Sequence, residues 1–135
     1  MRLFWRVHRL LYWASGGRIG ARLFGWHVIL LKTTGRKSGQ ARLVTLNALE
    51  DNDRYVVAAS FAGQPRHPAW FLNLQQQPEV QILEYGKWIP FQAREAQDAE
   101  CEQLWKAITE KDPSYAEYQS RTTRRIPVVI FQRKD

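Results

Sequence analysis

The sequence predicts an α+β domain: a small closed or half-closed barrel of six mainly antiparallel strands, with helices at its periphery. Six runs rich in β-branched and aromatic residues are separated by turn signals, and several connections are short enough for hairpins. Helical periodicity is confined to segments outside these runs. A chain of 135 residues can bury one continuous core but is too short for two ordinary domains, so we expect one compact barrel.

The first 24 residues are predicted to form an amphipathic helical segment. Arginines occupy one part of the helix surface, while apolar side chains recur at intervals of three and four residues: Leu3, Phe4, Val7, Leu10, Leu11 and Ala14. A Ser-Gly-Gly sequence ends or breaks this helix, and a second short helical piece is expected over 18–24. We therefore divide the chain into this segment, 1–24, and a barrel domain, 25–135.

The first three strands are expected to follow one another through two turns. Residues 26–33 form a largely apolar, β-branched run with few charges, which is typical of a buried strand. A polar loop with two glycines, 34–40, leads to a second extended run, 42–49. A turn at 50–53 precedes a third apolar run, 54–60, so the sequence predicts three consecutive strands.

A helix and a hairpin are predicted for the middle of the chain. Residues 61–68 contain one glycine and two prolines and are expected to form a loop, whose last proline opens a helix over 69–76. Two strands, 80–85 and 87–94, flank Gly86, which favours a tight turn between them.

The last third of the chain is expected to contain two helices and a strand. Asp98 is predicted to cap a helix that ends near residue 110, because its apolar residues fall on one side. A short helix follows over 113–122, beginning at a proline. The apolar run 126–131 is predicted as the sixth strand.

Positive charge is concentrated in the first part of the chain. Residues 1–49 contain nine Lys or Arg residues and no Asp or Glu, whereas the rest of the chain contains 11 basic and 13 acidic residues. Basic charge confined to one end indicates an anionic partner there, such as nucleic acid, a membrane surface or an acidic cofactor. Charge alone leaves all three open.

Several classes of protein are not favoured. There is no apolar run long enough to cross a bilayer, and arginines interrupt any signal-like stretch near the N-terminus. The single cysteine, Cys101, cannot form an internal disulfide, and no Cys and His cluster has the spacing of a zinc site, so we expect no metal. A cytoplasmic location is expected, with a peripheral position on the inner face of the cell membrane as the alternative.

The loop from Thr33 to Gln40, followed by Arg42, has the composition of an anion site. Its glycines let backbone N–H groups converge, its hydroxyls add short donors, and three cationic side chains supply charge. It is not a P-loop, because the Walker spacing is absent and the loop joins two strands. The alternative is a solvated hairpin tip whose charges only keep the protein soluble.

The segment 60–74 is the second candidate for ligand binding. Trp70 and Phe71 fall at the start of the predicted helix, where aromatic rings can form the wall of a site for a flat ligand. The alternative is that both simply form the buried face of a short helix. His67, a lone histidine beside a proline, is expected to be a cap or a surface contact and not a catalytic base.

These segments together resemble the deazaflavin-dependent nitroreductase family. The matching motifs occur in one order along the chain: Thr33 to Gln40 with Arg42, Arg66 to Trp70 with Asn73 and Leu74, Pro78 to Val80, and Pro113 to Gln119 with Thr122 and Ile126 to Val128. The resemblance implies a split β-barrel related to the FMN-binding barrels. It also implies coenzyme F420, an 8-hydroxy-5-deazaflavin, as cofactor, with FMN as the alternative.

The resemblance assigns residues to two parts of this cofactor. Family members bind its anionic phospholactyl-polyglutamate tail with the glycine loop, which here comprises Arg36, Lys37, Ser38, Gly39, Gln40 and Arg42. The deazaflavin ring is then expected to lie against Leu43, Val44 and Thr45 and against Ala59, Ser60, Phe61, Ala62 and Gly63, with Pro68 and Trp70 near its edge. The cationic loop found from composition and the family's tail site are the same segment.

Two tyrosines are the substrate-side candidates. In relatives, tyrosines of a Pro-Ser-Tyr-x-x-Tyr segment line the substrate side, which assigns Tyr115 and Tyr118 here as the catalytic candidates. The alternative is that both pack a helix onto the barrel. The chain departs from the family pattern at four positions where relatives carry tyrosine or a more polar residue: Asn47, Phe61, Phe71 and Asp112. A pocket with fewer phenols weakens the case for nitroimidazole activation.

The expected function is hydride transfer from reduced coenzyme F420 to a hydrophobic, electron-poor acceptor such as a quinone, an enone or a nitroaromatic. The alternative is a barrel of the same superfamily that is non-catalytic or binds FMN, haem or a fatty acid. Nucleic-acid binding is not expected, because the basic residues converge on one loop and one helix. Residues 1–24 suit an anionic membrane interface, an end of the barrel or a dimer interface, and both a monomer and a homodimer are open.

Overall fold

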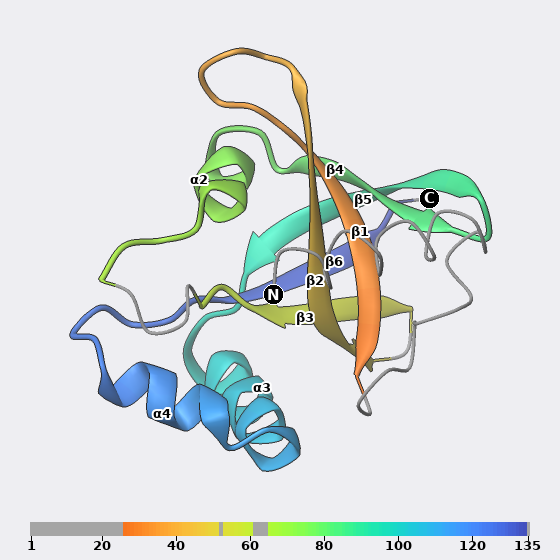
Figure 1. Ribbon diagram of the computed structural model, residues 1–135. Coiled ribbons are helices and arrows are strands. Elements are labelled where there is room, and N and C mark those ends of the chain that lie inside the picture. The colour runs from red at the N-terminus through yellow and green to blue at the C-terminus, as the bar shows by residue number, and fades with distance from the viewer. Residues whose placement is uncertain (1–25, 52, 61–64, 135) are drawn as a thin grey trace, which may run out of the picture.

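The computed structural model describes residues 26–51, 53–60 and 65–134 (Figure 1). The elements in these ranges are, in chain order, β1 (His27–Thr34), β2 (Ala41–Asp51), β3 (Arg54–Ala58), α2 (Ala69–Gln76), β4 (Glu79–Glu84), β5 (Lys87–Glu95), α3 (Asp98–Lys111), α4 (Ser114–Ser120) and β6 (Val128–Arg133). The predicted helical segment 1–24 lies outside the described residues.

The six strands close into one barrel in the order β1-β2-β3-β6-β5-β4, with β4 pairing back to β1. Every neighbouring pair is antiparallel. The predicted fold class, an α+β antiparallel six-stranded barrel with peripheral helices, is confirmed. The predicted hairpin is present, but Tyr85, predicted as the last residue of its first strand, belongs to the turn with Gly86; their φ angles are 49° and 79°.

Buried side chains on both faces of β3 and β6 explain their continuous apolar runs. Inside the barrel, Val57 and Phe131 belong to the main hydrophobic cluster. On the outer face, Val56 and Ile130 form a second cluster with Ile108 and other residues of α3. Figure 1 accordingly shows α3 and α4 together on one side of the barrel, while α2 lies near the end where the β1–β2 hairpin projects.

Two predicted strand boundaries are wrong by two residues for one reason. The sixth strand, predicted over 126–131, is Val128–Arg133, and the third, predicted to reach Ser60, ends at Ala58. Pro127 has no N–H with which to continue the ladder. Its carbonyl instead accepts a hydrogen bond of 2.8 Å from Ala59 N, so irregular segments meet beyond the paired strands.

The predicted cap of the long helix and the turn after the second strand are also corrected. Asp98 is the first residue of α3, and Gln97 holds the N-cap position without a side-chain hydrogen bond. The Asp98 carboxylate therefore acts through the helix dipole, which favours negative charge in the first turn. The strand β2 extends to Asp51, because Glu50 and Asp51 pair with β3, which shortens the predicted turn.

An ionic network across three strands gives a prediction about stability. Arg133 donates to both carboxylate oxygens of Glu84, at 2.5 and 3.0 Å, and Tyr55 Oη donates at 2.5 Å. Burial raises the pKa of Glu84, but these hydrogen bonds and the charge of Arg133 outweigh it and leave the pKa below its ordinary value of 4.5. A carboxylate with a lowered pKa stabilises the fold above its unfolded pKa and stops doing so as pH falls through its folded pKa.

We therefore expect Glu84→Gln to lower the free energy of unfolding by about 1–2 kcal/mol at pH 7, with the partial exposure of Arg133 keeping the loss small. The difference in the free energy of unfolding between Glu84→Gln and the unsubstituted protein should shrink below pH 4.5. Urea unfolding at pH 7 and pH 3.5 measures both values, and Glu117→Gln, in an exposed pair with Arg121, is the control. Equal losses at the two pH values would contradict the assignment of the network to the ionised carboxylate.

Candidate functional site

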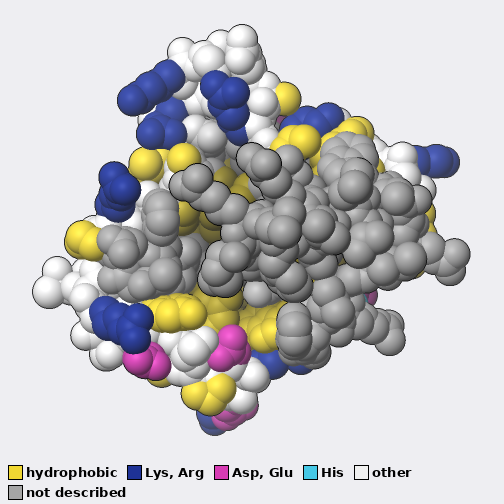
Figure 2. Space-filling model, in the orientation of Figure 1, with side chains coloured by type: hydrophobic (Ala, Val, Ile, Leu, Met, Phe, Trp, Pro, Cys, Tyr) yellow, Lys and Arg dark blue, Asp and Glu magenta, His cyan; other side chains and the backbone are white. Residues whose placement is uncertain are grey.

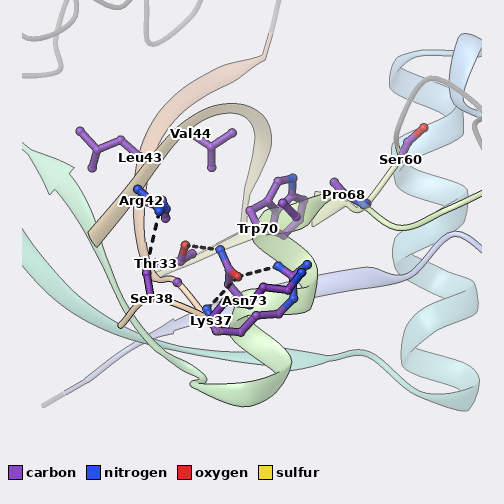
Figure 3. A pocket seen from close by; sticks show the side chains of 13 residues that line it. Thr33, Lys37, Ser38, Arg42, Leu43, Val44, Ser60, Pro68, Trp70 and Asn73 are labelled. Atoms are coloured by element: carbon purple, nitrogen blue, oxygen red, sulfur yellow. Dashed lines mark hydrogen bonds between the residues drawn. The ribbon is translucent and has the colours of Figure 1, made fainter. Parts of the chain in front are cut away.

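A pocket of about 580 Å³ lies between the loop that joins β1 to β2 and the helix α2 (Figure 3). Cavities of this size are typical of sites for cofactors and other small molecules. Its lining comes from segments that are distant in sequence: Thr33, Gly35, Arg36, Lys37, Ser38, Arg42, Leu43, Val44, Ser60, Pro68, Ala69, Trp70 and Asn73. The loop and the wall predicted from the sequence therefore face the same cavity.

The loop is held in a compact turn by its own hydrogen bonds. Gly35 N donates to Gln40 O and Gly39 N donates to Gly35 O, both at 2.8 Å. A Cβ on Gly35 would lie only 2.8 Å from Ser38 Oγ and 3.2 Å from Gln40 O, so a larger residue here would displace the Ser38 side chain. Gly39 has a φ of 71°, which glycine adopts without strain. Ser38 Oγ accepts bonds from Gln40 N at 3.1 Å and Arg42 Nη2 at 3.4 Å.

Asn73 attaches this loop to α2. Its Oδ1 accepts from the backbone N of Arg36 at 3.1 Å and from Arg36 Nη1 at 2.9 Å, while its Nδ2 donates to Thr33 Oγ1 at 3.3 Å (Figure 3). Asn73 and Thr33 are both buried. Asn73 was not among the predicted site residues, although it lies within a matching motif. The one signal in the sequence is an amide on the apolar face of a short helix.

The rim of the pocket is cationic. Arg36, Lys37 and Arg42 are exposed, and none of the described carboxylates forms an ion pair with them. Figure 2 shows Lys and Arg side chains gathered on the projecting end of the molecule that the β1–β2 hairpin forms. Cations without a carboxylate partner among the described residues, beside the Ser38 hydroxyl, favour a phosphate or carboxylate ligand.

The wall of the pocket is apolar and carries one unsatisfied hydroxyl. Leu43, Val44, Pro68 and Trp70 supply the apolar surface. Ser60 Oγ is buried, and it is the one buried side-chain oxygen or nitrogen in the described ranges without a hydrogen-bond partner. A buried polar atom without a partner is costly, so its position in a pocket wall suits a ligand that supplies the missing bond.

The predicted cofactor residues fall into three groups. Nine of them line the pocket: Arg36, Lys37, Ser38, Arg42, Leu43, Val44, Ser60, Pro68 and Trp70. Four others are adjacent in sequence but do not line it: Gly39, Gln40, Thr45 and Ala59. The remaining three, Phe61, Ala62 and Gly63, lie outside the described residues. Four lining residues were not assigned to the cofactor: Thr33 and Gly35, which belong to the predicted anion loop, and Ala69 and Asn73.

Tyr115 and Tyr118 do not line this pocket. They pack against the hydrophobic cluster beneath α3, where the Tyr115 ring lies 5.6 Å from both the Trp26 and the Tyr118 rings. Burial, with smaller effects of the charges of Asp112 and Tyr118, raises the pKa of Tyr115 to about 12. Its hydroxyl is therefore protonated at neutral pH and can act as a donor.

No group of three or more His, Cys, Asp or Glu side chains among residues 26–51, 53–60 and 65–134 is placed to hold a metal ion. No helix in that part of the chain is long and apolar enough to span a membrane.

Comparisons with known proteins show a family similarity over nearly the whole chain. Residues 4–133 match the family model described as F420H(2)-dependent quinone reductase. An F420H(2)-dependent quinone reductase of Mycobacterium tuberculosis is 39% identical over 133 residues, which cover 96% of this chain and 89% of that protein.

Two solved structures are similar over much of the chain. The structure of an F420-H2 dependent reductase, FDR-A, has 42% sequence identity and a TM-score of 0.70, covering 78% of this chain and 93% of its own. A second structure, a domain-swapped dimer, has 36% identity and a TM-score of 0.72, covering 98% of this chain and 100% of its own.

Proposed function

The chain belongs to the F420H(2)-dependent quinone reductase family, and from this premise we propose that the pocket between the β1–β2 loop and α2 binds coenzyme F420. Membership makes the protein an oxidoreductase with coenzyme F420 as its cofactor, and the alternative of a barrel that binds FMN, haem or a fatty acid is not favoured. The single observation that carries the site assignment is the coincidence, in one cavity, of an unpaired cationic loop and an apolar wall.

The loop fits the acidic tail of the cofactor. Arg36, Lys37 and Arg42 provide three positive charges without carboxylate partners among the described residues, and Ser38 adds a hydroxyl. Asn73 holds the backbone and the guanidinium of Arg36 in one arrangement, so the loop needs little ordering when an anion binds. We assign the tail to these side chains.

The apolar wall fits the flat ring. Leu43, Val44, Pro68 and Trp70 exclude water from one side of the cavity, and Ser60 Oγ can donate a hydrogen bond to a ring heteroatom or carbonyl. When bound, the reduced cofactor supplies a hydride to an electron-poor acceptor. The protein contributes orientation and a dry pocket, which decide whether the reacting atoms meet at contact distance.

A hydrophobic quinone is the proposed acceptor. The wall contains more apolar than polar side chains, and Leu43, 40% exposed, extends the apolar surface beyond the cavity. Reduction of nitro compounds is not part of the proposal, because the sequence departs from the nitroreductase pattern at Phe71, where many relatives have tyrosine.

The proposals for the oligomeric state and the cellular location rest on the relatives of this chain and not on its pocket. The relative solved as a domain-swapped dimer favours a homodimer for this chain as well. The family membership is consistent with a cytoplasmic enzyme. Membrane contact through residues 1–24 stays a prediction. Sedimentation without vesicles measures the oligomeric state. Sedimentation with anionic vesicles measures membrane contact.

Titration of the purified protein with coenzyme F420 tests the function directly. We expect saturable binding that weakens as salt is raised, because the cations of the loop are exposed and screened. Reduced F420 with a soluble quinone such as menadione should then give turnover. A correctly folded protein that does not bind F420 at moderate ionic strength would overturn the proposal.

Tyr115 carries a separate prediction, which rests on the family resemblance because the residue does not line the pocket. As a protonated phenol, it is proposed to donate a hydrogen bond to an oxygen of the acceptor. Tyr115→Phe should lower turnover about 10-fold, the effect of one lost hydrogen bond, and leave F420 affinity unchanged. Tyr85→Phe, on an exposed turn, is the control. Equal losses of turnover and F420 affinity would mean that Tyr115 only packs α4 against the barrel.

A further inference from the structure

We propose that Arg124 is a positioning residue for the F420 pocket: its guanidinium joins the end of β3, which leads into Ser60, to the start of α2, which carries Pro68 and Trp70. This inference rests on the proposed function for the use of the pocket, but not for the contacts themselves. Arg124 does not line the cavity, and it lies in the connection between α4 and β6.

The contacts of Arg124 reach both sides of the pocket wall. Its Nη1 and Nη2 donate to Ala59 O at 3.3 and 3.4 Å, and Nη1 lies 3.0 Å from His67 Nδ1. Ala59 directly precedes Ser60, and His67 directly precedes Pro68. One side chain therefore contacts the residues that directly precede Ser60 and Pro68, both of which line the pocket.

Ala59 depends entirely on this connection for its backbone hydrogen bonds in the described structure. Its N–H donates to Pro127 O at 2.8 Å, and its carbonyl accepts from Arg124. Ala59 is fully buried, so an unsatisfied carbonyl there would be costly. Loss of the guanidinium should move this carbonyl, and with it Ser60, toward another donor.

Hydrogen bonds to α4 and to neighbouring residues hold the backbone from which the Arg124 side chain extends. The amide side chain of Gln119, on α4, donates from Nε2 to Arg124 O at 2.8 Å and accepts at Oε1 from Ile126 N at 2.9 Å. The backbone N of Arg124 also donates to Thr122 Oγ1 at 3.3 Å. These bonds span the residues on both sides of Arg124, so its backbone is anchored to α4 before its side chain reaches the wall.

His67 is the second partner, and the contact requires its neutral form. Since a guanidinium only donates, Nδ1 must be unprotonated and accept. Burial and the charge of Arg124 lower the pKa of His67, and Glu95 partly opposes them, so the ring is neutral at pH 7. The imidazole ring also lies 4.9 Å from the Phe71 ring, which transmits the contact to the buried face of α2.

The expected consequence is a loss of turnover with little loss of cofactor affinity. Ser60 and Trp70 would shift relative to the ring, and a displacement of about 1 Å can reduce a rate about 100-fold. The loop that holds the tail depends instead on Asn73 and on its own backbone bonds, none of which involves Arg124. Replacing a residue needed only for folding would not lower turnover while leaving cofactor affinity unchanged.

The test compares Arg124→Gln with Arg125→Gln, which removes the same charge one residue away. Arg125 is exposed and its guanidinium contacts Cys101 Sγ at 3.0 Å, outside the pocket. We expect Arg124→Gln to lower kcat about 10- to 100-fold with reduced F420 and menadione while F420 affinity stays within about threefold. Arg125→Gln should change neither. Arg124→Lys should be intermediate, since one ammonium cannot span both partners.

NMR of the cofactor-free protein gives a second readout. In Arg124→Gln, the amide signals of Ser60 and Trp70 should shift and the pKa of His67 should rise, because the nearby charge is gone; His67→Asn identifies its signal among the three histidines. If Arg124→Gln does not fold, kcat and the amide signals of Ser60 and Trp70 in Arg124→Lys decide, because lysine keeps the charge beside His67.

Unchanged signals of Ser60 and Trp70, or a kcat within twofold of the unsubstituted protein, would overturn the proposal. Equal effects of Arg124→Gln and Arg125→Gln would overturn it as well. An unsubstituted protein that does not turn over would contradict the proposed function, and the NMR comparison would still decide whether Arg124 holds the wall.

Discussion

Replacing Arg36 and Lys37 together by alanine is expected to weaken the binding of coenzyme F420 by about 3–6 kcal/mol, or at least about 100-fold. Each side chain can form a charge-assisted hydrogen bond with the tail, and such bonds contribute about 1.5–3 kcal/mol. Removal of Arg36 also deletes a bond to Asn73 Oδ1, so the remaining loop should be less ordered. Isothermal titration or fluorescence titration with F420 measures the affinity.

The control for this double variant removes the same charge elsewhere. Lys87 on β5 and Lys106 on α3 are both exposed, and neither lines the pocket. Their double replacement by alanine should leave F420 affinity nearly unchanged and preserve its dependence on salt. In Arg36→Ala/Lys37→Ala that dependence should be shallower, because fewer cations are screened. If both double variants lost affinity equally, net charge and not this loop would attract the cofactor.

The anion loop could be predicted because its chemistry is local. Glycines, hydroxyls and cations follow one another within ten residues, and the hydrogen bonds that shape the turn, such as Gly35 N to Gln40 O, also lie within it. The strands on either side were found for the same reason, since periodicity and turn residues are properties of short windows. Local patterns therefore gave the barrel and the rim of its pocket.

Contacts between distant segments could not be predicted in this way. Asn73 meets Arg36 from 37 residues away, and Arg124 meets Ala59 from 65 residues away. The position of Asn73 on the apolar face of α2 indicates burial, but nothing in the sequence around it identifies the loop that it anchors. Its role follows only when β1 and α2 are brought together, because burial then makes its hydrogen bonds obligatory.

The end of β3 and the start of β6 also depend on a contact between distant segments. Val128 to Phe131 and Ile126 have similar apolar character, so composition places them in one strand. The ladder begins only after Pro127, whose carbonyl bonds to Ala59 across the end of β3. The sequence pattern around residue 126 does not reveal where β6 begins, because a contact with the end of β3 sets that boundary. Ser60 directly follows Ala59, which makes this contact.

Trp70→Ala is expected to combine a large loss of stability with a loss of cofactor binding. The Trp70 side chain is 8% exposed, and its ring lies 6.3 Å from that of Phe71 and 6.4 Å from that of Phe131. Truncating a buried aromatic residue typically lowers the free energy of unfolding by about 3–5 kcal/mol, because it leaves a cavity. Urea unfolding measures this loss.

The pocket wall explains why the same change should affect binding beyond its effect on stability. Trp70 faces both the main cluster inside the barrel and the cavity, so alanine removes apolar surface that the cofactor ring would contact. Trp70→Phe keeps a ring and should recover most of both properties. Trp105→Ala, on the half-buried face of α3 away from the pocket, should destabilise the fold without changing F420 affinity at temperatures where each variant is folded. Normal affinity in folded Trp70→Ala would remove Trp70 from the site and leave it as a core residue only.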